Sequence, residues 1–138
     1  MNNKCSLLNF LKEIDNDFSP SLSKKVILSD YVDKILTKSN LIIESYQEDI
    51  CGLIVLYCND FINKKAYISL VGVAAKYRNK GIAKTMMEKA IQVAASSGMK
   101  IIGIHSNNSI AIHLYKKLGF KIIEPGERAY MELELHKM

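Results

Sequence analysis

A basic loop that leads into a helix is the first place in this sequence where residue types and spacing suggest chemistry. The stretch 71–84 carries Arg78, Gly81 and Ala83 in the spacing Arg-x-x-Gly-x-Ala, between a strand-like segment and a helical one. A helix N-terminus offers main-chain N–H groups without intrahelical partners, together with the positive end of the helix dipole. Gly81 lets a ligand come close to the main chain. The loop therefore predicts a binding site for a phosphate or pyrophosphate group.

Two common phosphate-binding loops have a different spacing from this one. A P-loop has Gly immediately before its Lys-Ser/Thr pair, whereas Ala83 precedes Lys84 and Thr85 here. The dinucleotide fingerprint needs three glycines at G-x-G-x-x-G spacing after a strand, and no such set is present. A purely structural strand–loop–helix turn remains the alternative interpretation of the loop.

The charge distribution also indicates an anion site at this loop. The 138-residue chain has a formal net charge of +5 at pH 7, and the window 76–100 holds six basic residues against Glu88 alone. A compact polyanion explains this concentration of charge, and a solvated helix face is the alternative. A nucleic-acid groove is not expected, because Tyr77 is the one aromatic residue in the window and base-stacking side chains are missing.

Length and composition indicate one globular domain, residues 1–138, with 49% hydrophobic and 24% charged residues. No apolar run approaches the roughly 20 residues that span a bilayer, and no signal peptide is evident, so we expect a cytoplasmic protein without membrane contact. Cys5, Cys51 and Cys58 are widely spaced and odd in number, which favours reduced thiols. No Cys/His cluster has metal-ligand spacing, so no metal site is expected.

Hydrophobic periodicity and turn residues predict an α/β chain without internal repeats. We expect two helices, three strands, a helix, a strand, a helix and two strands. These elements are predicted at residues 6–16, 30–38, 41–46, 51–58, 65–73, 81–97, 100–105, 109–118, 120–124 and 129–135.

A second segment with recognisable spacing begins 25 residues after Ala83. It reads Asn-x-x-Ala-x-x-Leu-Tyr-x-x-x-Gly-Phe, with these types at Asn108, Ala111, Leu114, Tyr115, Gly119 and Phe120. Together with the loop, it strongly resembles the GCN5-related N-acetyltransferase (GNAT) superfamily, whose acetyl-CoA loop is usually Arg/Gln-x-x-Gly-x-Gly/Ala. The resemblance covers roughly residues 41–135, and the first 40 residues match only in being helical. Taken alone, Tyr115 is also compatible with a packed core residue, and Asn108 with a helix N-cap.

The resemblance implies a mixed, mostly antiparallel sheet with helices on both faces. The sheet would be splayed between the family's fourth and fifth strands, here 67–73 and 101–105. Residues 1–40 would form a helical acceptor-side segment and residues 41–135 an acetyl-CoA-binding core. The pantetheine arm of acetyl-CoA would fill the gap and bond to the main chain of Val71 and Val73, and Gly72 would tolerate a strand bulge there.

The resemblance also implies how the rest of the co-substrate is held. The pyrophosphate would bind the amides of the loop and the first helical turn, which belong to Asn79, Lys80, Gly81, Ile82, Ala83 and Lys84. Arg78 and Lys84 would add positive charge, and Asn108 would meet the pantetheine. Tyr115 would lie near the sulfur as the general acid that protonates the departing CoA thiolate.

The general base remains open at this stage. Family members often place a Glu on one of the two splayed strands, whereas the corresponding positions here carry Tyr67, Ser69 and Gly103. His105, at the end of its strand, has a suitable reference pKa near 6.5 but is also compatible with a structural role. Water-mediated deprotonation, or an amine that arrives neutral, would need no dedicated base.

The implied activity is acetyl-CoA-dependent N-acetylation of a primary amine of a small molecule by direct transfer. Acetylation of a protein or peptide and a non-catalytic acyl-CoA-binding module are the alternatives. Specificity would come from residues 7–38 and the 59–64 turn, where several acidic residues would favour a cationic amine: Asp15, Asp17, Asp30, Asp33 and Asp60. Both a monomer and a homodimer are compatible with the sequence.

Overall fold

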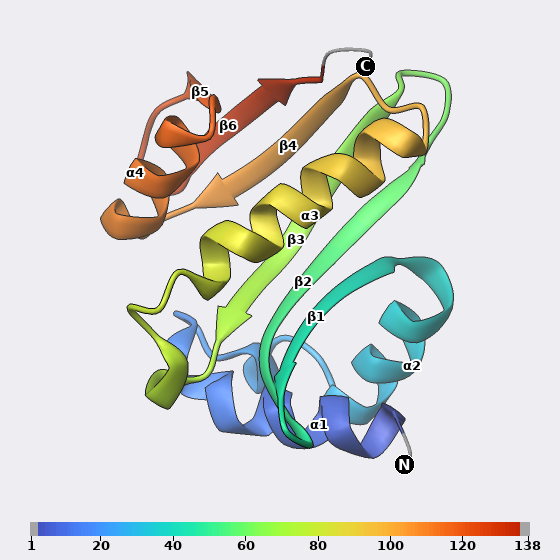
Figure 1. Ribbon diagram of the computed structural model, residues 1–138, viewed down its shortest axis with the longest axis vertical. Helices are drawn as coiled ribbons and strands as arrows, with labels where there is room; N and C mark the ends of the chain where they lie inside the picture. The colour runs from blue at the N-terminus through green and yellow to red at the C-terminus, as the bar shows by residue number, and fades with distance from the viewer. Residues whose placement is uncertain (1–2, 136–138) are drawn as a thin grey trace.

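The computed structural model describes residues 3–135, which form a six-stranded mixed sheet flanked by helices (Figure 1). The strand order is β1-β2-β3-β4-β6-β5; β3 and β4 run parallel, and the other neighbouring strands run antiparallel. The strands are β1 (Asn40–Tyr46), β2 (Asp49–Asp60), β3 (Lys65–Val73), β4 (Ile101–Ser106), β5 (Lys121–Glu124) and β6 (Ala129–Glu134). The α-helices are α1 (Asn3–Ile14), α2 (Leu28–Lys38), α3 (Ile82–Ser96) and α4 (Ser109–Lys117). Short 3-10 turns occur at η1 (Asp15–Asp17), η2 (Leu22–Lys24) and η3 (Ala75–Tyr77).

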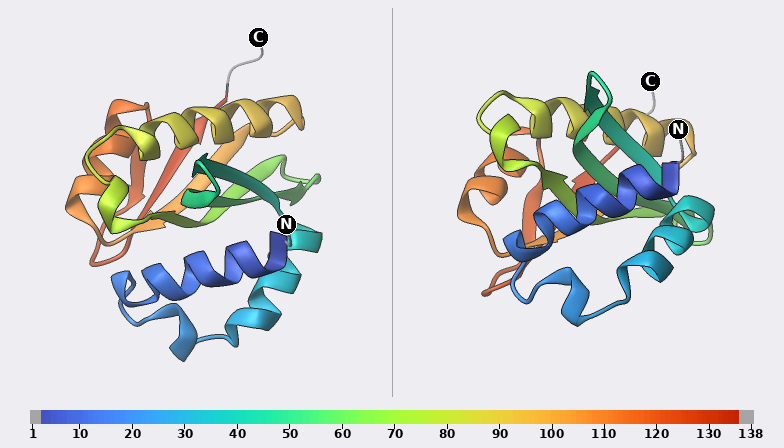
Figure 2. Two further views of the ribbon diagram at one scale, coloured as in Figure 1. Left: turned by 60° about the horizontal axis from the view of Figure 1, so that its bottom comes forward. Right: turned by 90° about the horizontal axis from the view of Figure 1, so that it is seen from below.

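Helices cover both faces of the sheet, as the sequence predicted. Figure 2 shows α3 on one face, and α1 and α2 on the other. Each face has its own apolar core, which we call the α3-side core and the α1-side core. The α3-side core includes Ile54, Ile68, Met86, Ile102, Ile104 and Tyr115. The α1-side core includes Leu7, Phe10, Leu11, Ile14, Leu53 and Leu70.

Helix α1 buries one stripe of apolar side chains against the sheet. Leu7, Phe10, Leu11 and Ile14 of α1 are all at most 3% exposed. These side chains recur at helical spacing on one stripe, so their burial against the sheet stabilises α1 far more than helix propensity does.

No helix in residues 3–135 is long and apolar enough to cross a membrane. Cys5, Cys51 and Cys58 are free thiols and form no disulfide.

A bulge in β3 changes which residues face each core. Leu56 of β2 pairs with Ile68, whereas the preceding Val55 pairs with Leu70, so Ser69 is the extra residue. Ile68 packs in the α3-side core, and Leu70, only two positions later, packs in the α1-side core. The bulge therefore reverses the alternation, and Val71 and Val73 pack against the α3-side core. The sequence-based placement of a bulge at Gly72 was wrong, because Gly72 pairs regularly with Leu53.

The gap expected between the two central strands is present. β3 and β4 pair only from Lys65↔Ile101 to Ile68↔Ile104. After that point the strands separate, and Figure 1 shows their arrowheads pointing apart. Residues 69–73 of β3 consequently have β2 on one side and no strand partner on the side of β4.

Gly72 is required by close packing and not by backbone conformation. A Cβ atom added at Gly72 would lie 2.4 Å from the Cδ1 atom of Ile14, which is 1% exposed. Protein interiors are packed densely, so Ile14 has little room to move. The absence of a side chain at this position therefore lets α1 pack directly onto β3.

We expect Gly72→Ala to lower the free energy of unfolding by about 1–3 kcal/mol, the usual cost of overpacking a core. The added methyl group would displace the Ile14 side chain. Ile14→Val removes the clashing Cδ1 atom, so the double variant should recover part of the loss that Gly72→Ala causes. Urea denaturation of both single variants and the double variant measures this coupling, and strictly additive losses would show that the contact with Ile14 is not the cause.

Candidate functional site

The loop between β3 and α3 holds a run of unpaired main-chain amides. Within the described residues, none of the amides of residues 79–84 donates a hydrogen bond. Gly81 is the N-cap of α3 and forms no side-chain capping bond, so the first turn of the helix keeps its free N–H groups. This is the set of amides that the sequence predicted for a phosphate or pyrophosphate, and it lies at the positive end of a 15-residue helix.

Backbone conformation explains the glycine in this loop. Gly81 has a φ of 78°, and Asn79 has a φ of 64°. Both values lie in the left-handed region, which glycine adopts freely and asparagine more readily than most residues. An added Cβ at Gly81 would meet no atom within 4 Å, so there is open space beside the main chain for a ligand.

Arg78 is tied to other parts of the fold, whereas two nearby lysines are not. Its Nε atom donates to the Val73 carbonyl at 3.1 Å, and its Nη2 atom forms an ion pair with Asp17 of η1. The guanidinium thus connects the end of β3 to the segment after α1. Lys80 and Lys84 are exposed and form no ion pair with another residue of the described range 3–135.

The main chain of β3 faces the gap at the residues that the resemblance selected. The Ala74 amide donates to Cys51 of β2 at 2.9 Å. Main-chain groups alternate sides along a strand, so Val71 and Val73 direct theirs away from β2, toward the side where β4 has separated. The Val73 carbonyl already accepts from Arg78, which leaves the Val73 amide and the Val71 amide and carbonyl for a ligand.

The second sequence motif begins at the N-cap of α4 and includes Tyr115 in its last turns. Asn108 is the N-cap, and its Oδ1 atom accepts from the amides of Ile110 at 2.9 Å and Ala111 at 3.1 Å. Tyr115 is 4% exposed and packs against Phe120 with ring centroids 5.9 Å apart. Ala111, one turn before Tyr115, packs against the same α3-side core.

The Tyr115 hydroxyl is available to a ligand. It forms no hydrogen bond with any other described residue. Every buried side-chain oxygen or nitrogen atom in residues 3–135 has a hydrogen-bond partner, so the Tyr115 oxygen is not one of these buried atoms. The hydroxyl oxygen is therefore within reach of solvent, although the ring is buried. Burial raises the pKa of Tyr115 to about 12, so the phenol keeps its proton at neutral pH and can donate it.

The residues considered as general bases lie near each other on the other side of the sheet. Tyr67 and His105 are joined by a hydrogen bond of 2.6 Å between the phenol oxygen and Nδ1. Ser69 is exposed at the bulge. Sequence reasoning missed Lys65, Tyr130 and Glu132, which surround this pair. Tyr130 and Glu132 are two positions apart on one strand and therefore share a face of the sheet. Only the strand order places that strand beside β4.

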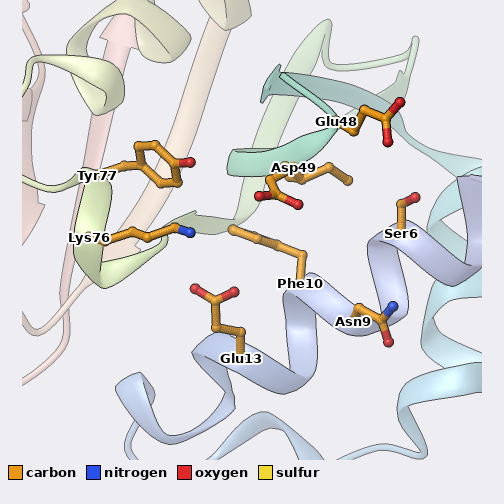
Figure 3. A pocket seen from close by; sticks show the side chains of 9 residues that line it. Ser6, Asn9, Phe10, Glu13, Glu48, Asp49, Lys76 and Tyr77 are labelled. Atoms are coloured by element: carbon orange, nitrogen blue, oxygen red, sulfur yellow. The ribbon is translucent and has the colours of Figure 1, made fainter. Parts of the chain in front are cut away.

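A cavity of about 300 Å³ lies between α1, the β1–β2 turn and η3 (Figure 3). Its acidic residues are Glu13, Glu48 and Asp49, and Lys76 and Tyr77 close the opposite wall. Figure 3 shows these side chains around one opening, with Phe10 in its centre. The cavity is lined by residues of α1, the β1–β2 turn and η3, and residues 59–64 do not line it.

Most of the aspartates selected from the sequence for the acceptor have other partners. Asp15 binds the Ser23 amide and hydroxyl, and Asp17 pairs with Arg78. Asp33 pairs with Lys4, and Asp60 binds Asn63. These carboxylates already bind other residues of the fold, so the acids of the cavity are better placed to meet a cation.

A model of the acetyltransferase (GNAT) family matches residues 8–120, which is most of the 138-residue chain. The chain belongs to the GNAT family. Acetyl-CoA is the co-substrate of this family.

Solved structures share the fold of this GNAT chain at low sequence identity. Aminoglycoside 6'-acetyltransferase type Ii has a TM-score of 0.80 at 16% identity, covering 99% of this chain and 94% of that one. The yncA protein of Salmonella typhimurium, solved with its cofactor acetyl-CoA, has a TM-score of 0.79 at 14% identity, covering 99% and 92%. At this level of identity, the likeness establishes the fold alone.

Curated relatives match parts of this GNAT chain more closely. The chloroplastic GCN5-related N-acetyltransferase 6 of Arabidopsis thaliana is 42% identical over 67 residues, which are 47% of this chain and 23% of that protein. The chain spans between 23% and 59% of the length of the curated relatives that it matches here.

We expect Asn108→Ala to lower the free energy of unfolding by about 1 kcal/mol, because two amides of α4 lose their acceptor. Asn108→Ser keeps a capping oxygen and serves as the control, so it should retain most of the stability. Chemical denaturation measures both variants. If wild type and Asn108→Ala were equally stable, the Asn108 side chain would not stabilise α4 as an N-cap.

Proposed function

We propose that this protein transfers the acetyl group of acetyl-CoA to a primary amine of a small molecule. The single observation that carries the proposal is the run of unpaired amides at residues 79–84, which opens beside the gap between β3 and β4. A long, flexible thioester with a polyphosphate end matches this arrangement. Its anionic end meets the α3 N-terminus, and its acyl end lies along β3.

The binding step uses the groups that the fold leaves unpaired. The amides of residues 79–84 hold the pyrophosphate, and Lys80 and Lys84 add positive charge from exposed positions. Arg78 acts mainly on the loop itself, because Asp17 already neutralises its guanidinium. The main chain of Val71 and Val73 binds the pantetheine arm along the open side of β3, near the Asn108 cap of α4.

The chemical step is a direct attack of a neutral amine on the thioester carbon. A β3 amide stabilises the oxyanion of the tetrahedral intermediate, and the preorganised dipole needs no rearrangement during the reaction. Collapse of the intermediate breaks the carbon–sulfur bond, and the Tyr115 hydroxyl gives its proton to the CoA thiolate. Positioning of the two reactants supplies much of the remaining acceleration.

The acidic cavity beside α1 supports a cationic amine as the acceptor. Three carboxylates line it against one lysine, and 300 Å³ suits a small molecule. A protein or peptide terminus is the alternative acceptor, since it also carries an amine. Assays with free amines and amino sugars, run in parallel with peptides, separate the two, and turnover with peptides alone would reject the small-molecule acceptor.

The alternative to an enzyme is a non-catalytic module that binds acyl-CoA. It would bind CoA tightly and acetylate no amine in the panel. The free hydroxyl of Tyr115 favours the enzyme, because a buried tyrosine in a purely structural role usually gives its hydroxyl to a protein partner.

We expect Tyr115→Phe to lower kcat by about 10²–10⁴-fold, the usual contribution of a general acid. The affinity for acetyl-CoA should change little, because the ring and its packing against Phe120 are kept. Steady-state kinetics and calorimetric titration of acetyl-CoA measure the two effects. Since the pKa of Tyr115 is about 12, the wild type should keep this proton donor at neutral and mildly alkaline pH and lose it only as the pH approaches 12. Wild-type turnover in the variant would remove Tyr115 from the mechanism.

We expect Lys84→Gln to weaken acetyl-CoA binding about tenfold, as a charge-assisted hydrogen bond to phosphate is lost. Lys117→Gln is the matched control, since it removes the same charge from the exposed C-terminal end of α4. Titration at two salt concentrations measures both. If both variants lost the same affinity for acetyl-CoA, the effect would come from the net charge of the protein and not from a contact made by Lys84.

A further inference from the structure

The arginine of the loop motif is held at the end of β3 by two contacts. The Arg78 Nε atom donates to the Val73 carbonyl at 3.1 Å, and the Arg78 Nη2 atom donates to the Asp17 carboxylate. Asp17 lies 61 positions earlier in the chain, at the end of η1. One guanidinium therefore connects the segment after α1 to the strand that borders the gap.

The η3 turn brings Arg78 close to the end of β3. The Arg78 amide donates to the Ala75 carbonyl at 3.3 Å, which closes the turn. Ala74, at the N-cap of η3, is 1% exposed, and its amide donates to the Cys51 carbonyl of β2. The turn is thus anchored on the sheet, and the side chain that follows it reaches back to Val73.

The segment that carries Asp17 is anchored as well. Asp15, at the start of η1, accepts hydrogen bonds from the Ser23 amide at 2.8 Å and the Ser23 hydroxyl at 2.6 Å. Ile14, the residue before η1, is 1% exposed and packs against Gly72 of β3. Asp17 therefore holds the guanidinium from a defined position beside the strand.

The ion pair makes Arg78 a poor ligand for phosphate. The Asp17 carboxylate neutralises the guanidinium, and a phosphate at Arg78 would also lie close to that negative charge. Lys80 and Lys84 are exposed and have no ion-pair partner among residues 3–135, so they are better placed to attract an anion. The two contacts of Arg78 consequently point to a role at β3.

The Val73 carbonyl is a group that benefits from a donor. The N–H and C=O groups of one strand residue point to the same side, so this carbonyl faces the gap together with the main-chain groups of Val71. Its oxygen carries a partial negative charge, which would repel the oxyanion that forms on the thioester carbon. The repulsion is strong where water is excluded, because the local dielectric constant is low.

We propose, on the basis of the acetyl transfer above, that Asp17 and Arg78 are positioning residues of the reaction. Asp17 holds the guanidinium against the Val73 carbonyl, and the guanidinium compensates the partial negative charge of that oxygen. The end of β3 then presents amide donors to the developing oxyanion without an uncovered carbonyl beside them. The pair acts through the main chain of β3 and not by contact with the reacting atoms.

The test compares wild type with Asp17→Ala, Arg78→Met and the double variant. We expect kcat to fall about tenfold in each single variant, less than the roughly 10²–10³-fold that the loss of an oxyanion donor itself costs. The double variant should lose little more, because the two side chains act as a unit. Asp17→Glu keeps the carboxylate and should retain most of kcat.

Asp33→Ala is the matched control. Asp33 is also an exposed aspartate in an ion pair, in this case with Lys4, and the article's proposed reaction does not use it. Both aspartate variants should keep nearly the thermal stability of wild type, since exposed ion pairs contribute little to stability. Only Asp17→Ala should lower kcat, and the same loss of kcat in Asp33→Ala would overturn the proposal.

The affinity for acetyl-CoA separates this role from direct binding of the pyrophosphate. If Arg78 bound the pyrophosphate, Asp17→Ala would free the guanidinium and strengthen acetyl-CoA binding. We expect instead that Asp17→Ala keeps Kd within about twofold of wild type while kcat falls, the pattern of an interaction made in the transition state. Calorimetric titration measures Kd, and steady-state kinetics with the amine that wild type acetylates measures kcat. Tighter acetyl-CoA binding with wild-type kcat in Asp17→Ala would overturn the proposal.

Infrared spectroscopy of bound acetyl-CoA, isotopically labelled at the thioester carbonyl, tests the same contact without turnover. Hydrogen-bond donors polarise the carbonyl and lower its stretching frequency, so the frequency should be higher in Asp17→Ala and Arg78→Met than in wild type. An identical frequency in all three proteins, with an active wild type, would reject this inference and leave acetyl transfer intact. Absence of turnover with every amine and peptide would instead reject the proposed function, and this inference with it.

Discussion

The loss of pairing between β3 and β4 is the constraint on which the rest of the structure depends. Two parallel strands that stay paired would satisfy each other's main-chain groups and leave nothing for a ligand. Here pairing stops at Ile68 and Ile104, so the main-chain groups of β3 that point away from β2, such as those of Val71, have no strand partner at the centre of the sheet. Unpaired main-chain groups are costly when buried, and a bound acyl-CoA would satisfy them.

The bulge at Ser69 and the two apolar cores make this opening compatible with a stable fold. The extra residue reverses the alternation of β3, so that Ile68 serves one core and Leu70 the other. Both faces of the strand remain packed on either side of the separation. Gly72 then lets α1 approach the strand beyond the bulge, which places this helix next to the open edge.

The electrostatic features follow the same geometry. The α3 N-terminus and the exposed lysines form a positive region at one end of the opening, and the cavity beside α1 is acidic. Arg78 connects the end of β3 to η1 through the Val73 carbonyl and Asp17. Tyr115 lies within the apolar α3-side core, whereas Tyr67 and His105 lie among charged neighbours.

The sequence by itself determined the helices and strands, the two motifs and the fold class, because these depend on interactions between residues that are close along the chain. The period of Leu7, Phe10, Leu11 and Ile14 specifies an amphipathic helix wherever it packs, and Asn108 or Gly81 act on adjacent residues. The bulge at Ser69, the Arg78–Asp17 pair and the group around His105 depend on strand register and on residues distant along the chain. Only the tertiary structure decided them, because spacing within one strand does not determine its neighbour.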